Sequence, residues 1–410
     1  MKLAGIAIVL AACDSSPPPE KVQPAPTVAP AATPVAQQAT HDLIEKFQCN
    51  RCHDVPGTPA AVRDKHCFRC HQQIHAGTFD AKAEAIEKWR GRIHSLRDAP
   101  SLVAASRLNR GWVKDFLLHP HDVRPGSIAQ MPRLAISDGE AERLAAFLVP
   151  VQTGDPLPAD PALIARGQQL YQQLACGRCH RFTGSAVDDV ALHDGAKIGE
   201  EMRRGGPEVE AQAIGWTLAP DLRFARDRVQ PGQLAAWIER PGGAMPVMAG
   251  VGPREAEALA AFIANAALAP APKPDVPKRL PVLERPVLWA EVSVKVFHDT
   301  CWHCHAVPDF ARGDGGPGNS GGFGFAPRGL DLSSYTGISQ GSLDQDGERR
   351  SIFEKLPDGT PRVVAHLMAR HTEVAGGSVD GVRGMPLGLP PLTLEQIQLV
   401  ESWVAQGRPQ

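Results

Sequence analysis

Eight of the nine cysteines fall into four copies of one pattern, C-x-x-C-H. Two cysteines separated by two residues match the two vinyl groups of one haem, and the histidine that follows is then placed to ligate the iron. The predicted thioether cysteines are Cys49, Cys52, Cys67, Cys70, Cys176, Cys179, Cys301 and Cys304, and the predicted proximal ligands are His53, His71, His180 and His305. The sequence therefore predicts four covalently bound haem c groups.

Zinc is the competing interpretation of the first two motifs. Cys49, Cys52, Cys67 and Cys70 follow one another as C-x2-C-x14-C-x2-C, which is close to the spacing of a zinc ribbon. A zinc ribbon needs no histidine directly after each second cysteine, and the other two motifs have no C-x-x-C partner. Haem attachment accounts for all four motifs, and we therefore prefer it.

Six-coordinate haem iron needs a second axial ligand, and a Met thioether in that place raises the potential. Three of the seven methionines precede a proline 60 to 80 residues after a haem motif. These three, Met131, Met245 and Met385, are the candidate distal ligands. Met248 and Met368 are the rival methionines, and neither precedes a proline.

Each Met-Pro pair is followed by a segment with the pattern of an amphipathic helix. Ser137 with Glu140 and Thr393 with Gln396 predict capping boxes, and Gly252-Pro253 predicts a cap with proline at the first helical position. Apolar residues before the motifs predict a preceding helix as well. The repeating unit is therefore a helix, C-x-x-C-H, a long irregular stretch, Met-Pro and a final helix.

The first unit holds two motifs, whose first cysteines are 18 residues apart. We assign Met131 to the His53 haem, so the His71 haem needs another ligand. The candidate is His94, in a predicted helix over residues 81–96, with His75 as the alternative and His66 and His41 behind them. The remaining histidines are expected at the surface or in hydrogen bonds: His119, His121, His193, His298, His366 and His371. A haem with two imidazoles would have a lower potential than the His/Met haems.

The order of helix, haem motif, Met-Pro and helix resembles class I cytochrome c, most closely over Ala165-Arg166-Gly167 to His180 and on to Met245-Pro246. The resemblance implies a small helical fold around each haem, with Met131, Met245 and Met385 as distal ligands. The predicted fold class is mainly α, with three tandem cytochrome c-like domains, long irregular loops and covalent haems as cores. Composition changes place these domains at residues 41–150, 161–266 and 285–410.

The N-terminus has the pattern of an export signal. Lys2 precedes an apolar run that is too short to span a bilayer, so residues 1–12 are predicted as a signal peptide. Leu10-Ala11-Ala12-Cys13 resembles the bacterial lipobox, which implies lipidation of Cys13. Residues 13–40 are rich in Pro and Ala and predict an irregular tether. The expected location is the periplasmic side of the inner membrane, with the outer membrane as the alternative.

Charge and composition limit the partners. The chain has 43 basic and 45 acidic side chains and no nucleic-acid-binding motif, so redox proteins and the membrane are the expected partners, and nucleic acid is not. Three haems with His and Met ligands have no open position, which favours an electron carrier over an enzyme. The alternatives are a peroxidase-like site on the second haem, or a cytochrome subunit of a respiratory or photosynthetic complex.

Overall fold

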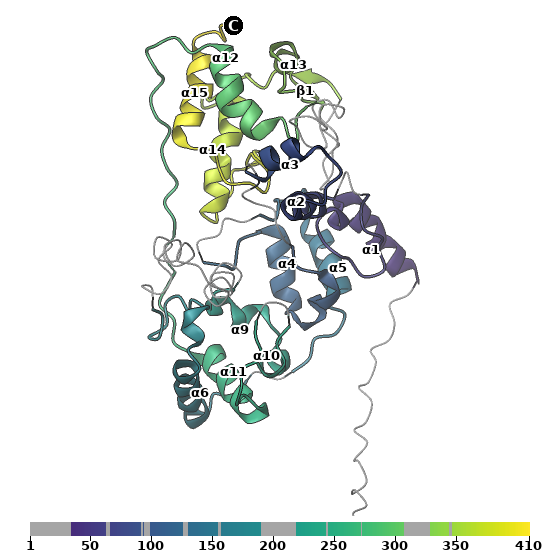
Figure 1. Cartoon of the computed structure of the whole chain (residues 1–410), viewed down its shortest axis with the longest axis vertical. Helices are drawn as coiled ribbons and strands as arrows, with labels where there is room; N and C mark the ends of the chain where they lie inside the picture. Colours follow the sequence, from purple (N-terminus) through teal and green to yellow (C-terminus); the bar gives the residue numbers. More distant parts are fainter. Residues whose placement is uncertain are drawn as a thin grey trace, which may run out of the picture.

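The chain is described by a computed structural model that covers residues 34–62, 66–91, 93, 99–125, 130–154, 157–189, 219–242, 245–271, 273–306, 329–343 and 347–410. The described part is mainly helical, with one two-stranded antiparallel sheet (Figure 1). Its buried apolar side chains form three separate clusters, one from each of three successive stretches of the chain.

The first cluster lies between residues 43 and 149. The elements of this part are α1 (Pro34–Phe47), η1 (Cys49–Arg51), α2 (Cys67–Ala76), α3 (Ala83–Arg90), η3 (Leu102–Arg107), α4 (Arg110–Leu118) and α5 (Asp138–Leu148). Helices α4 and α5 pack on each other, and α1 packs on α5. The predicted capping box at the start of α5 is confirmed, because the Glu140 carboxylate accepts from the Ser137 backbone N–H at 2.9 Å.

The second cluster is built around the crossing of two helices. Its part of the chain contains α6 (Pro161–Gln173), η4 (Cys176–Arg178), η6 (Leu222–Phe224), α9 (Ala225–Arg228), α10 (Pro231–Glu239) and α11 (Pro253–Asn265). Helix α11 begins as predicted, with Gly252 as its cap and Pro253 at its first position. It packs closely on α6, which runs up to the third haem motif.

The third cluster surrounds Trp403, which is fully buried. Its elements are α12 (Trp289–Val292), the π-helix η7 (Ser293–Cys301), α13 (Tyr335–Gln340), β1 (Ser342–Leu343), β2 (Arg349–Arg350), α14 (Arg362–Val374) and α15 (Leu394–Ala405). The predicted capping box of Thr393 and Gln396 begins α15. The residues just before α12 follow α15: the Leu283 N–H donates to Ser402 Oγ, and the Val287 N–H donates to Gln406 Oε1.

The three parts do not follow one another in space as they do in the sequence. Along the long axis of the molecule, α6 and α11 lie at one end and α12 and α15 at the other, while α1 to α5 lie between them (Figure 1). The N-terminal part therefore sits between the other two. Among the described residues, none of the helices has the length and apolar character needed to cross a membrane.

Two predicted boundaries are wrong. Helix α1 begins at Pro34, inside the stretch predicted as an irregular tether up to residue 40. Proline is tolerated in a first helical turn, and the Ala and Gln residues after it are good helix formers. The helix predicted over residues 81–96 is shorter, since α3 covers only Ala83–Arg90. It ends there because the Gly91 N–H caps its last carbonyls.

Candidate haem-binding sites

The first and third haem motifs have the same local backbone. Helix α1 is followed by Gln48 and helix α6 by Ala175, each in the left-handed conformation, with φ of 51° and 53°. A short 3-10 turn then carries the first cysteine of the motif. The motif histidine folds back on that cysteine, because its N–H donates to the cysteine carbonyl at 3.0 Å in both cases. Both cysteines and the histidine are thus brought to one turn.

The imidazoles of these two motifs are oriented by backbone carbonyls. His53 Nδ1 lies 2.8 Å from the Pro100 oxygen, and His180 Nδ1 lies 2.8 Å from the Pro220 oxygen. A carbonyl only accepts, so each Nδ1 carries the proton, and the lone pair of that tautomer is on Nε2. Burial is the main cause that lowers the pKa of His53, which favours the neutral form that a metal ligand needs. Both rings are prepared to bind iron through Nε2.

The fourth motif closes the π-helix η7. The N–H groups of Cys304 and His305 both donate to the Cys301 carbonyl, at 3.1 and 2.9 Å, and Trp302 Nε1 donates to the Leu332 carbonyl at 2.7 Å. Burial lowers the pKa of His305 to about 4, so the ring is neutral at physiological pH. Its Nδ1 is buried and has no hydrogen-bond partner among the residues that the structure describes.

The second motif differs from the other three because it begins an α-helix. His66 caps α2, and its Nδ1 accepts from the Arg69 N–H at 3.2 Å. Cys67, Cys70 and His71 follow on one face of the helix, where residues three and four apart are neighbours. The His66 ring therefore serves as the N-cap of α2, which is a structural hydrogen bond.

The motif cysteines are thiols outside any disulfide. Burial raises the pKa of Cys49 and Cys176 to about 11 and that of Cys301 to about 12, so these groups are protonated at neutral pH. Reduced thiols in pairs beside an imidazole are the donor set that covalent haem attachment needs. The described residues contain no group of three or more His, Cys, Asp or Glu side chains arranged to hold a metal ion.

Three of the four motifs lie together. The thiols of Cys52 and Cys67 adjoin, and the hydrogen bond between them is the main cause that lowers the pKa of Cys67. Burial, followed by the neighbouring Cys67, raises the pKa of Cys304 to about 11. The rings of His71 and His303 face each other with 6.0 Å between centroids. The first, second and fourth motifs are therefore neighbours, although more than 200 residues separate the second from the fourth.

The structure places the candidate methionines in different ways. Met131 and Cys49 are both packed on the first apolar cluster, and Met385 and Cys301 are both packed on the third. Met245 is half-buried and is not among the described side chains packed on the second cluster. All three ligand assignments stay predictions.

The Met-Pro segments of the first and third parts adjoin each other. A Cβ atom on Gly388 would lie 2.6 Å from the Gln130 oxygen, so a side chain there would collide with the backbone next to Met131. Gly388 also has φ of +68°, which favours glycine. The loops carrying Met131 and Met385 are thus held side by side.

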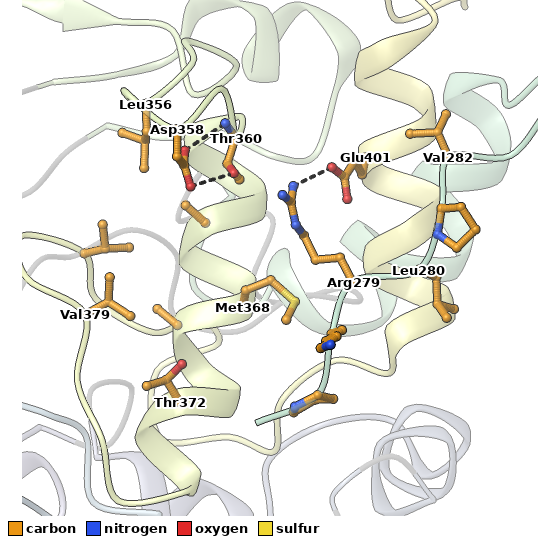
Figure 2. A pocket seen from close by; sticks show the side chains of 16 residues that line it. Arg279, Leu280, Val282, Leu356, Asp358, Thr360, Met368, Thr372, Val379 and Glu401 are labelled. Atoms are coloured by element: carbon orange, nitrogen blue, oxygen red, sulfur yellow. Dashed lines mark hydrogen bonds and ion pairs between the residues drawn. The ribbon is translucent and has the colours of Figure 1, made fainter. Parts of the chain in front are cut away.

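The rival Met368 faces another space. It lines a cavity of about 800 Å³ between α14, α15 and residues 277–282, opposite the ion pair that joins Arg279 to Glu401 at 2.6 Å (Figure 2). The lining contains none of the motif cysteines or histidines. Met368 also packs on the third apolar cluster, as Met385 and Cys301 do, so Met385 stays the ligand predicted from its place before a proline.

The candidate ligands of the His71 haem have different environments. His94 lies outside the described residues, as does His193. His75 is one helical turn beyond His71 on α2, and its Nε2 is buried without a hydrogen-bond partner in the described part of the chain. The His41 ring packs edge-on against Phe147, with centroids 5.7 Å apart.

The other described histidines contact aromatic rings or backbone oxygens. His121 lies against Phe116 and Phe224, and His298 lies against Trp302. His366 Nδ1 is 2.6 Å from the Arg383 oxygen, and His371 Nε2 is 2.9 Å from the Leu392 oxygen. The peptide oxygen of His119 accepts from the His121 ring.

His303 lies beside the second haem motif, although the sequence pattern does not single it out. It occupies a spacer position inside the fourth motif, where any residue is allowed, so nothing in the local pattern marks it. Its side chain has solvent-accessible surface, yet burial lowers its pKa to about 4, with His71 as the next cause.

Comparison with known proteins supports this chemistry for the middle of the chain. Residues 162–263 match the family model described as cytochrome C oxidase, cbb3-type, subunit III. This segment is therefore similar to a cytochrome c domain. It runs from α6 to α11 and includes Cys176, Cys179 and His180, the motif whose imidazole is anchored to the Pro220 carbonyl. No curated protein and no solved structure matches the chain.

The match carries a coarse functional conclusion. A cytochrome c domain binds haem c covalently and transfers electrons to and from redox partner proteins, which is consistent with a carrier rather than an enzyme. The mainly helical fold agrees with the predicted fold class. The match covers about a quarter of the chain, so the other three haem motifs stand on their own residues.

Proposed function

We propose that the chain is a tetrahaem c-type cytochrome that relays electrons between redox proteins at the outer face of a bacterial membrane. The observation that carries the proposal is the repeated geometry of the first and third motifs. Each has a left-handed residue, a 3-10 turn and a histidine whose Nδ1 is held by a proline carbonyl. One of the two lies in the segment that matches a cytochrome c family.

The residues of each site have separate tasks. The two thiols of a motif hold the porphyrin covalently, and the following histidine ligates iron through Nε2, oriented by its Nδ1 hydrogen bond. Haem held in this way would supply one-electron chemistry at iron, between a reduced and an oxidised partner protein. Met131, Met245 and Met385 are the proposed distal ligands of three haems, and their filled sixth positions leave no place for a substrate.

The proposed route follows the arrangement of the motifs. The first, second and fourth motifs adjoin one another, while the third lies in the part of the molecule that α6 and α11 form at one end (Figure 1). This arrangement supports transfer between the ends of the molecule through the haems of the first part. The sequence order of the haems is then not their order along the route.

The proposed location rests on the sequence of the N-terminus. Residues 1–12 would be removed on export, and Cys13 would carry the lipid that anchors the protein. Both lie outside the described residues. A Cys13→Ser variant is expected to leave the membrane fraction, whereas an unchanged distribution would contradict the anchor.

The experiment that tests the function is a redox titration of the purified full-length protein, followed by optical and electron paramagnetic resonance spectra, with the haem count taken by mass spectrometry. The expected result is four haems, all low-spin, with resolved potentials. Fewer than four haems, or zinc in place of haem at the first two motifs, would overturn the proposal. A high-spin ferric haem that binds peroxide would favour the peroxidase-like alternative.

A further inference from the structure

The second and fourth motifs present two imidazoles to each other across the junction of two parts of the chain. His71 comes from α2, and His303 comes from the turn that follows η7. Their ring centroids are 6.0 Å apart, and the ring planes are inclined by 47°. The neighbouring cysteines adjoin as well, since Cys67 acts on the thiol of Cys304.

This separation fits two ligands of one metal ion. An imidazole nitrogen binds a transition metal at about 2 Å, so two rings on opposite sides of one iron have centroids roughly 6 Å apart. Rings that merely pack against each other are found anywhere between about 4.5 and 7 Å. Ligation of one iron is the better explanation of this distance, because His71 already belongs to a haem motif and His303 approaches it from another element.

The accessible surface of His303 points the same way. His303 keeps solvent-accessible surface, although it lies at the contact between the first and third parts of the molecule. Arg51, another spacer residue, comes near it from the first motif.

We propose that His303 is the distal iron ligand of the haem bound by Cys67, Cys70 and His71. The assignment rests on the proposed function, because it needs a haem at the second motif. It replaces the predicted His94 and its alternative His75. His75 follows His71 by four residues on the same helix face, so both rings approach from the same side.

The assignment gives the second haem a different character from the others. Two imidazole ligands lower its potential relative to haems with a methionine. His303 is next to Cys304 in the chain, so the second haem is ligated from the attachment turn of the fourth. The ligand would therefore bring these two haems together and connect the first part of the chain to the third.

The test uses full-length haem-loaded protein carrying His303→Gln, with Arg178→Gln as the matched control at the same spacer position of the third motif. Mass spectrometry should find four haems in both variants. In His303→Gln, one haem in four is expected to become high-spin in the ferric electron paramagnetic resonance spectrum. Arg178→Gln, His94→Gln and His75→Gln should each keep four low-spin haems.

Two further variants protect the test against a folding defect. In His303→Gly, added imidazole should restore the low-spin signal, because it fills the vacated position. In His303→Met, all haems should stay low-spin, and the lowest of the four potentials should rise. Four low-spin haems and unchanged potentials in all the His303 variants would overturn the assignment, as would a high-spin haem in His94→Gln or His75→Gln. Failure of the proposed function would instead appear as missing haem in the wild-type protein.

Discussion

At the scale of single residues, backbone carbonyls orient the imidazoles of two motif histidines, His53 and His180. The Pro100 and Pro220 oxygens each fix one Nδ1 at 2.8 Å. Neither proline stands at a constant distance from its motif, since His53 is followed by Pro100 after 47 residues and His180 by Pro220 after 40. The fold therefore determines which carbonyl holds Nδ1, whereas the motif itself supplies the histidine that ligates iron.

The distal methionines give a prediction at this scale. Replacing Met131, Met245 or Met385 by Leu should remove roughly one third of the near-infrared sulfur-to-iron charge-transfer intensity and lower one potential, because the thioether favours ferrous iron. Near-infrared absorption and a redox titration of the oxidised proteins measure both effects. Met248→Leu and Met368→Leu are the controls and should change neither. A loss of intensity in Met248→Leu alone would move the second assignment to that residue.

At the scale of secondary structure, the α6–α11 crossing depends on a residue without a side chain. A Cβ atom on Gly167 would collide with the Ala258 carbonyl oxygen and lie 2.7 Å from Phe262 Cβ. Tyr171 and Phe262 fill the space beside it, with ring centroids 5.7 Å apart. The glycine lets two helices approach closely next to the third haem motif.

Gly167→Ala is therefore expected to destabilise the protein by about 3 kcal/mol, because the backbone of α11 has to move away. Gly139→Ala is the control, since an added Cβ there has no neighbour within 4 Å in α5, and the change in stability should stay below about 0.5 kcal/mol. Guanidinium unfolding followed by circular dichroism measures both. Equal stability of the two variants would contradict the close packing.

Helices α1 and α5 are joined by an ion pair. Lys46 Nζ donates to Glu140 Oε1 at 2.6 Å, and the Ser137 backbone and hydroxyl donate to the other carboxylate oxygen. The Lys46 bond, followed by the Ser137 backbone, lowers the pKa of Glu140 from 4.5 to about 2. The carboxylate therefore stabilises the folded state above about pH 4.5, and this contribution is lost as the pH falls towards 2.

Glu140→Gln should make the free energy of unfolding less dependent on pH between 5 and 2. The loss at neutral pH is expected to be about 1 kcal/mol, since Lys46 is half exposed and water screens the pair. Unfolding curves at several pH values measure the difference from wild type. Glu142→Gln is the control on the same helix, and an equal loss in both variants would contradict the special role of Glu140.

At the scale of the whole molecule, one buried glutamine joins the first and second parts of the chain. Gln230 is 2% exposed. Its amide donates to the carbonyls of Ser106, Leu108 and Val151, and its oxygen accepts from the N–H and hydroxyl of Thr153. The Gln230 N–H also donates to the Arg107 oxygen at 3.0 Å. These bonds fix the second part on the first.

Gln230→Ala should cost about 3 kcal/mol of unfolding free energy, because several buried polar groups lose their partner together. Arg240→Ala, at a side chain 79% exposed, is the control and should be nearly neutral. Chemical unfolding measures the cost, and limited proteolysis near residues 150–160 should become faster in Gln230→Ala alone. Equal cleavage rates in the two variants would mean that the junction is held by other contacts.

Much of the local structure was predictable because its signals are local. The caps of α5, α11 and α15 are confirmed, since a capping pattern needs only residues a few positions apart. The start of α1 was predicted wrongly because composition alone did not separate a helix-forming Ala and Gln stretch from a tether. The end of α3 was predicted too late, because the apolar pattern did not mark the cap at Gly91. The assignments of Met131, Met245 and Met385 remain predictions, because a distal ligand is chosen by contacts far along the chain.

The sequence by itself determined the four attachment motifs and their proximal histidines, because two thiols and an imidazole at fixed spacing are a requirement of covalent haem chemistry. Tertiary structure alone decided which motifs are neighbours. It placed the first part between the other two. It also brought the rings of His303 and His71 together, with 6.0 Å between their centroids, although more than 200 residues of chain separate them. The physical reason is that covalent spacing is local, whereas the packing of separate apolar clusters against one another is not.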